Sequence, residues 1–141
     1  MMEFIVVGKI QPKQRPRFKR CGAFVRTYTQ QATLDYEGLV AKRYIEKYGE
    51  LKLNGALAME INAYFNVPKS LSKKKKAELY GKPNTAHRRG DIDNVAKSVL
   101  DGLNGIAYDD DKVVYDLHVR KLYVSSDDDL ERIEVKIYGN S

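Results

Sequence analysis

The stretch GDIDNVAKSVLDGLNGIAYDDDKVVYD, from Gly90 to Asp116, decides how this chain is organised. Its apolar residues recur at the spacing of one helical face, at Ile92, Val95, Ala96, Val99, Leu100 and Leu103. Asp91 stands directly before this run, where an N-cap residue belongs, and Asn104-Gly105 can close the helix. The sequence therefore predicts a helix over residues 92–103 with one buried side.

The same stretch is the acidic part of a basic protein. Between residues 91 and 116 there are seven Asp against Lys97 and Lys112, a local charge of −5 in a chain whose net charge is +6. An acid at a helix start often only complements the helix dipole. That explanation covers one Asp, but it covers the pair Asp91 and Asp93 together with the cluster 109–111 less well. Carboxylates that meet from two segments are ligands that hard divalent cations prefer.

Composition restricts the class of protein. A chain of 141 residues with 43% hydrophobic and 31% charged residues is typical of one soluble domain, which we place at residues 1–141. The single cysteine, Cys21, excludes a disulfide framework and a cysteine metal site, and it suits a reducing cytosol. No run has the length of a membrane span or the form of a secretory signal. We therefore expect a cytoplasmic protein with no membrane partner.

One basic segment precedes the first predicted helix, and a second precedes the acidic stretch. Residues 9–26 hold seven Lys or Arg and no acid, with Phe18 and Phe24 interleaved, and residues 69–90 hold eight Lys or Arg against Glu78. A charge run is often only a solvated face. Interleaved aromatic residues and stiffening prolines favour a surface that follows a phosphate backbone. The candidate DNA contacts are Lys13, Arg15, Arg17, Lys73, Lys74, Lys75, Lys76, Arg88 and Arg89.

The periodicities predict an α+β fold: one domain with a four-stranded mixed sheet and helices packed mainly on one face. Strands are expected at 3–10, 56–66, 113–124 and 132–138, with a short hairpin turning at Gly22. Besides the helix at 92–103, a short helix is expected within 70–81. Another should begin at Thr29 and end near Tyr48, with Leu34, Gly38, Ala41 and Ile45 on the same side as Tyr48.

Strand alternation offers a way to choose among the clustered aspartates. In the predicted strand 113–124 the apolar face is Val113, Tyr115, Leu117 and Val119. If the strand already begins at the cluster, Asp111 lies on that face, under the helix 92–103, and Asp110 points away. We therefore prefer Asp111 as the third acid, with Asp110 as the alternative.

These residues carry a resemblance that covers nearly the whole chain. The motif Asp91-Ile92-Asp93-Asn94-x-x-Lys97 is followed by Leu103-Asn104-Gly105, Asp110-Asp111-Lys112 and Asp116-Leu117-His118-Val119. Together they resemble the RusA family of Holliday-junction resolvases, which prophages often carry. The front half agrees at Gly8, Lys13, Arg15-Pro16-Arg17, Gly22, Tyr28-Thr29 and Tyr36-Glu37. One departure is Val113 where the family often has Gln, and Asp109 makes the acidic cluster three residues long.

The resemblance implies a Mg²⁺-dependent homodimeric endonuclease, with Mn²⁺ able to substitute, that resolves four-way DNA junctions in recombination and repair. It implies that the metal-binding residues are Asp91, Asp93 and either Asp111 or Asp110, and that Lys97 is the essential lysine. Chemically, Lys97 is placed to hold the scissile phosphate or the attacking water; the alternative is a simple pair with Asp93 one turn earlier. The absence of a cysteine or histidine cluster argues against zinc.

Two other classes of function remain open on the sequence. One is a metal-dependent nuclease for other branched DNA, such as flaps or forks; the other is a non-catalytic DNA-binding module whose acids merely offset its lysines. Asp101 reads as structural and His118 as a surface or interface residue, while His87 is a candidate phosphate contact. Two symmetric cuts in a junction need two sites, and one chain has one, so a two-fold homodimer is expected.

Overall fold

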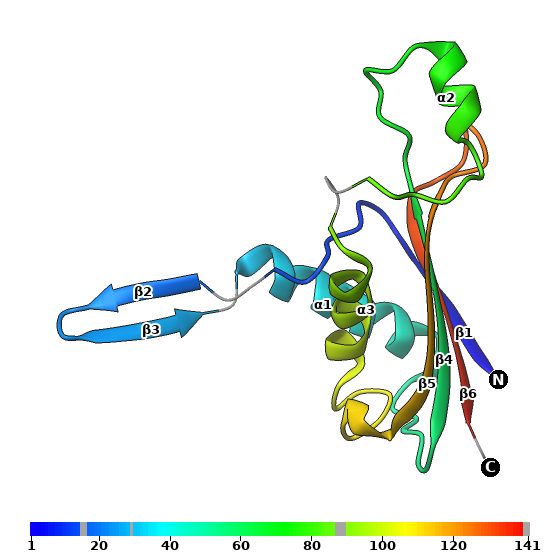
Figure 1. The fold of residues 1–141 in the computed structure, drawn as a ribbon. Coiled ribbons are helices and arrows are strands. Elements are labelled where there is room, and N and C mark those ends of the chain that lie inside the picture. The colour runs from blue at the N-terminus through cyan, green and yellow to red at the C-terminus, as the bar shows by residue number, and fades with distance from the viewer. Residues whose placement is uncertain (15–16, 29, 87–89, 140–141) are drawn as a thin grey trace.

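The computed structural model describes residues 1–14, 17–28, 30–86 and 90–139, with only the backbone at residues 17 and 26–28 (Figure 1). The single domain contains both strands and helices. The elements are β1 (Met2–Val7), β2 (Arg17–Cys21), β3 (Phe24–Tyr28), α1 (Gln31–Tyr48), β4 (Leu57–Phe65), α2 (Lys73–Leu79), α3 (Ile92–Leu103), the 3-10 turn η1 (Asp111–Val113), β5 (Val114–Tyr123) and β6 (Arg132–Gly139).

Four strands form one mixed sheet in the order β1-β6-β4-β5. The pair β4 and β5 is parallel, whereas β6 runs antiparallel to both β1 and β4. One row crosses the whole sheet, because Phe4 pairs with Val135, Val135 with Ile61, and Ile61 with Val119. The predicted four-stranded mixed sheet is confirmed.

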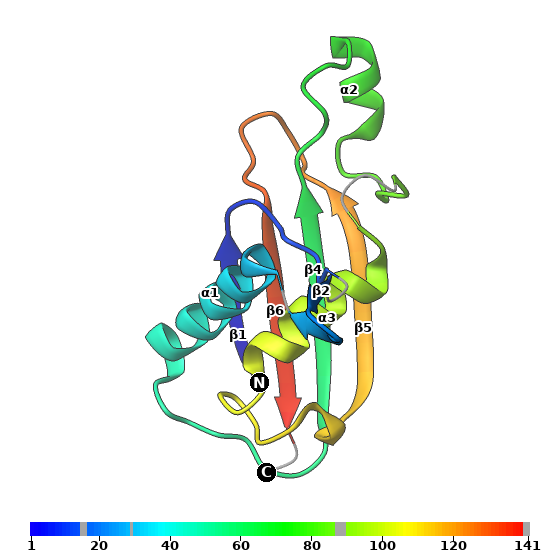
Figure 2. The ribbon, with the colours of Figure 1, turned by 90° about the vertical axis from the view of Figure 1, so that its left-hand side faces the viewer.

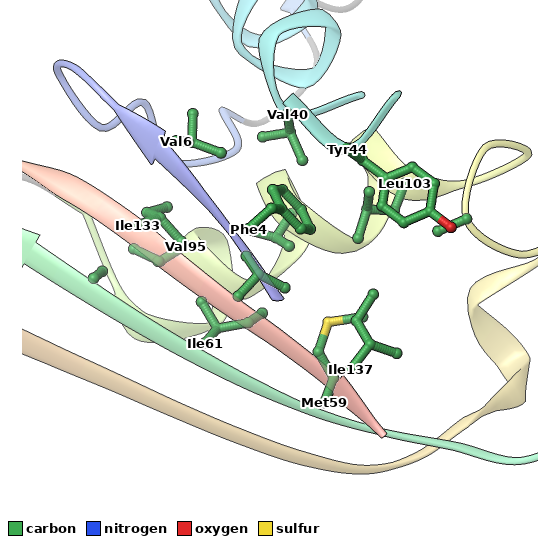
Figure 3. Close-up of a cluster of buried hydrophobic side chains, with 14 of the residues drawn as sticks. Phe4, Val6, Val40, Tyr44, Met59, Ile61, Val95, Leu103, Ile133 and Ile137 are labelled. Carbon is green, nitrogen blue, oxygen red and sulfur yellow. The ribbon is translucent and has the colours of Figure 1, made fainter. Parts of the chain in front are cut away.

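The core lies between one face of this sheet and the helices α1 and α3, which lie on that face (Figures 1 and 2). Side chains of β1, β4 and β6 alternate between buried and more accessible positions, as a sheet covered on one side requires. Figure 3 shows the buried set converging on the two helices, with Phe4 packed edge-on against Tyr44 at 5.9 Å between ring centres. The predicted buried face of β4, from Met59 to Phe65, is confirmed.

The face predicted for the first helix is wrong. The buried residues of α1 are Thr33, Tyr36, Val40 and Tyr44, whereas Leu34 and Ile45 are 47% and 44% exposed. A tyrosine buries a large ring and still directs its hydroxyl to a polar partner at the rim, and Tyr44 donates to the carbonyl of Leu51 in this way. Gln30 is the N-cap, and the predicted cap Thr29 lies outside the described residues.

The helix α3 has the bounds that its periodicity predicts, and it packs closely on α1. Gly102 permits the approach: a Cβ there would lie 3.0 Å from both the Glu37 carbonyl oxygen and the Val40 Cβ. This contact fixes α3 against the helix layer along its buried side. Its opposite edge, with Asp93 and Lys97, is exposed.

Two parts of the chain project from the body. Within the described part of the chain, the strands β2 and β3 pair only with each other. They form an arm that extends away from the helix layer, and α2 lies beyond one end of the sheet (Figure 1). No helix in the described part of the chain combines the length and the apolar character needed to cross a membrane.

Candidate active site

The acidic pair Asp91 and Asp93 lies at the start of α3, where neither side chain makes an ion pair with another described residue. Asp91 occupies the N-cap position, but its side chain makes no capping hydrogen bond. Asp93 is in the first turn, and Lys97 follows one turn later; all three side chains are exposed. Among the described residues no ion pair joins Asp93 to Lys97. Both carboxylates and the ammonium are therefore available to an external ligand.

The segment around Pro12 and Lys121 of β5 hold the start of α3 in place. The backbone N–H of Lys13 donates to the Asn94 carbonyl at 2.9 Å, and Lys121 Nζ donates to the Gly90 carbonyl at 2.7 Å. Gly90 has a φ of 94°, and a Cβ there would lie 2.6 Å from the ring of Pro12. Only glycine fits that position. The backbone that leads into Asp91 is thus held by the segment around Pro12 and by the end of β5.

The second acidic group lies beyond the other end of α3 (Figure 2). The backbone N–H of Asp111 donates to Asn104 Oδ1 at 2.9 Å, and Asp110 Oδ1 accepts from the Lys112 N–H at 2.9 Å. Partial burial, then the carboxylates of Asp110 and Asp101, raises the pKa of Asp111. The hydrogen bond from Lys112 lowers the pKa of Asp110. Asp109 pairs instead with Lys52 at 2.9 Å.

The alternation argument for Asp111 does not hold. Residues 111–113 form the 3-10 turn η1, and β5 begins only at Val114, so neither Asp110 nor Asp111 has a strand phase. The cause is local, because the Asp110 side chain caps the turn and offers the backbone an alternative to the sheet. The choice between the two acids therefore stays a prediction.

One chain does not bring the two acidic groups together. The helix between them has twelve residues, a length of roughly 18 Å at 1.5 Å per residue. Among the described residues no group of three or more His, Cys, Asp or Glu side chains is close enough to hold a metal ion. The donor chemistry fits Mg²⁺ or Mn²⁺, since both groups consist of carboxylates. The two groups nevertheless stand at opposite ends of α3.

The predicted basic residues divide into three sets. Lys13 is engaged inside the chain, where its Nζ lies 2.7 Å from Glu37 and 3.0 Å from Asp101. Burial lowers the pKa of Lys13, but these two acids outweigh it and the net shift is upward. Asp101 thus has a structural role, as the sequence predicted, through an ion pair.

The lysines of α2 face outward. Ser72 caps that helix by accepting from the Lys75 N–H, and the side chains of Lys73, Lys74 and Lys75 are exposed, with Lys76 half-buried. Arg15, Arg88, Arg89 and His87 lie outside the described residues, as does the side chain of Arg17. His118 is exposed and lies 3.1 Å from Asp116.

Sequence reasoning missed an apolar groove beside the acidic pair. It has a volume of about 450 Å³ and runs between α3 and the edge strand β5, lined by Ile92, Asp93, Ala96, Lys97, Leu100, Leu117 and Val119. The alternation of apolar residues in β5 was the sequence signal for this surface, but it predicted that their side chains would be buried under α3. Instead Tyr115 is 70% exposed, and Ile92 and Leu117 are 47% and 39% exposed.

Comparison with known proteins places this arrangement. The family model described as "Endodeoxyribonuclease RusA" matches residues 8–138. The chain is also 32% identical over 141 residues to the uncharacterized protein YqaN of Bacillus subtilis, an alignment that covers 96% of this chain and 94% of that protein. The match includes the arm, the α3 site and the last strand. The chain therefore belongs to the RusA endodeoxyribonuclease family.

Proposed function

We propose that this protein is a divalent-metal-dependent endonuclease that cuts four-way DNA junctions as a homodimer, in recombination and repair. The observation that carries the proposal is the start of α3, where Asp91, Asp93 and Lys97 are exposed and form no ion pair with another described residue, in a chain of this family. Two exposed carboxylates and an exposed ammonium gathered at one helix start can bind a divalent cation and a charged substrate.

The chemistry follows from the residue types. A divalent cation, Mg²⁺ or Mn²⁺, supplies a water of lowered pKa and offsets the charge that grows on the phosphate. Asp91 and Asp93 hold the carboxylate side of that site, together with Asp111 or Asp110. Lys97 lies one helical turn from Asp93 and positions the scissile phosphate or the attacking water. These assignments are proposals that rest on the residue pattern and on the family.

A second copy of the chain would complete the site. Because α3 separates Asp91 and Asp93 from Asp110 and Asp111 by roughly its own length, one chain presents only part of the ligand set at each end. In a two-fold dimer the second acidic group of one subunit is free to reach the first group of the other. Two such sites, related by the dimer axis, suit two cuts in a symmetric junction.

The edge strand β5 is the surface that fits this dimer. Among the described residues only β4 and a bridge between Pro83 and Leu122 pair with it, so its edge is open from Val114 to Arg120. The exposed Tyr115 and Leu117 and the adjoining groove supply apolar area for an interface.

Antiparallel contact of two β5 edges also gives the required direction. It places the start of one strand beside the end of the other. The start adjoins Asp110 and Asp111, and the end adjoins Gly90 through the Lys121 hydrogen bond. Each subunit then carries its second acidic group toward the Asp91 and Asp93 pair of its partner.

Cleavage of defined DNA substrates tests the proposal. An immobile four-way junction, a fork, a flap and a linear duplex are each incubated with the protein and Mg²⁺, Mn²⁺ or EDTA. We expect paired symmetric cuts in the junction with either metal, none in EDTA, and none in the duplex. Preferential cutting of forks or flaps would assign the protein to other branched DNA. A gel shift with every metal and no cut would make it a binding module.

A further inference from the structure

The arm formed by β2 and β3 has no buried side chain among its described residues. Each described side chain from Phe18 to Val25 is exposed, and the two strands pair only with each other. Phe18 and Phe24 are 73% and 77% exposed. A two-stranded ribbon without a covering layer is marginally stable in water. Two aromatic rings exposed on one arm indicate a surface that binds a partner.

The charge of the arm selects the partner. Residues 17–28 contain four Lys or Arg and no Asp or Glu, within a chain of net charge +6. A nucleic acid meets the arm with opposite charge along its whole length, whereas a second copy of this chain carries a net charge of the same sign as the arm and is acidic only locally. A two-stranded ribbon also has the width that a DNA groove admits. Exposed phenyl rings stack on bases irrespective of sequence.

The arm begins beside the proposed catalytic end of α3. The segment that leads into it is tied down by the Lys13 N–H bond to the Asn94 carbonyl and by the Gln14 N–H bond to Thr33 Oγ1 at 3.3 Å. Its five-residue strands span roughly 17 Å, the rise of about five stacked base pairs. The arm then extends outward from the helix layer, so DNA held at Asp91 and Asp93 can continue along it (Figure 1).

We infer that the arm recognises the branch point of the DNA: Phe24 stacks on a base pair whose face is uncovered where helical arms meet, and Lys19 and Arg20 contact the flanking phosphates. Phe24 is the stacking residue because it pairs with Cys21 next to the Gly22 turn, at the tip. A linear duplex offers such an open face only at its two ends. The inference rests on the proposed function and adds the element that distinguishes branched from linear DNA.

Binding to 2-aminopurine-labelled DNA tests this stacking. The full-length protein is titrated in EDTA against a junction with the fluorophore beside the branch point and against a duplex with the same local sequence. We expect a fluorescence change on the junction only. Phe24→Leu should abolish it and weaken junction binding about 5- to 100-fold, with duplex affinity unchanged. Phe24→Tyr keeps a ring and should behave as wild type.

Matched variants separate stacking from other causes. Val25→Ala alters a neighbouring exposed side chain (62% exposed) that pairs with Arg20, on the opposite face of the ribbon, and should leave the signal intact. Equal losses in Phe24→Leu and Val25→Ala, or in Phe24→Leu and Phe24→Tyr, would contradict stacking. A dimer that dissociates without DNA in Phe24→Leu would instead assign the arm to the second copy. Cutting assays are independent: wild type that stacks but never cuts refutes the proposed function alone.

The single cysteine supplies a second readout. Cys21 is exposed and pairs directly with Phe24, so an azidophenacyl photocrosslinker attached there reports the surroundings of the tip. We expect crosslinks to nucleotides next to the branch point. Crosslinks confined to the ends of the DNA arms, or to the partner subunit, would overturn the inference.

Discussion

The two ends of α3 are both acidic, but the fold treats them differently. At the start, the Asp91 side chain makes no capping hydrogen bond, and neither Asp91 nor Asp93 forms an ion pair with another described residue. At the far end, the Asp110 side chain caps η1, and the backbone of Asp111 is bound by Asn104. One group is available and the other is partly structural. The difference is consistent with the proposal that the first pair binds a ligand, while the second group is positioned by its turn.

The largest expected effect is on catalysis at the available end. Asp91→Asn and Asp93→Asn should each lower the rate of junction cutting at least about 1000-fold, equivalent to about 4 kcal/mol in the transition state. Because both side chains are exposed and neither has a partner among the described residues, the free energy of unfolding should change by less than about 0.5 kcal/mol. Single-turnover cutting and urea unfolding measure the two quantities. A large loss of stability would show that the pair is structural.

The next effect concerns the surface between the two ends. Leu117→Asp places a charge in the α3–β5 groove and should weaken dimerisation about 30-fold or more. Leu130→Asp is the matched control, since Leu130 is 60% exposed in the turn before β6. Light scattering over a range of concentrations follows the change. If both variants dimerise as wild type does, the interface lies elsewhere.

A smaller effect is expected at the ion pair that anchors the arm's root. Lys13→Met leaves Glu37 and Asp101 without their shared cation and should cost about 1–2 kcal/mol of stability, because the three side chains are only 17–32% exposed. Lys19→Met, in the exposed arm, is the control and should leave unfolding unchanged. Urea titrations compare them. Equal stability of the two variants would mean that solvent screens the Lys13 pair.

The smallest effect is a pH dependence at the far end of α3. Burial and the neighbouring acids raise the pKa of Asp111, so the folded chain holds that proton to a higher pH than the unfolded chain does. Stability is therefore lost as pH rises from the ordinary Asp pKa of about 3.9 through the raised value. Asp111→Asn should match wild type at low pH and exceed it at neutral pH. Urea melts in metal-free buffer at both pH values test the sign.

Much of the fold was predictable because its signals are local and periodic. The helix at 92–103 and the alternating strand β4 appear where the pattern places them. The buried side of α1 differs from the predicted one. Tyrosines, whose rings bury more surface, face the core in place of Leu34 and Ile45. The start of β5 was predicted too early, because a two-residue alternation of apolar residues does not indicate that the Asp110 side chain caps a turn.

The candidate site was predictable only in its parts. The residue types and the spacing of Asp91, Asp93 and Lys97 mark the start of α3. These residues are separated from Asp111 by the length of the helix. The sequence predicted that length, but a motif of residue types does not state the distance between its parts. The isolation of the arm was not readable at all, since a hairpin signal at Gly22 does not say whether another layer covers it.

Mixing two inactive variants tests the shared site most directly. In Asp93→Asn and Asp111→Asn homodimers each site lacks a carboxylate, so both should bind the junction without cutting it. A mixed dimer of the two would contain one intact site, composed of Asp93 from the second variant and Asp111 from the first. We predict that mixing restores nicking of one strand, in proportion to the mixed-dimer fraction; Asp110→Asn in place of Asp111→Asn identifies the acid. If no mixture cuts although subunits exchange, each site lies within one chain and the account is contradicted.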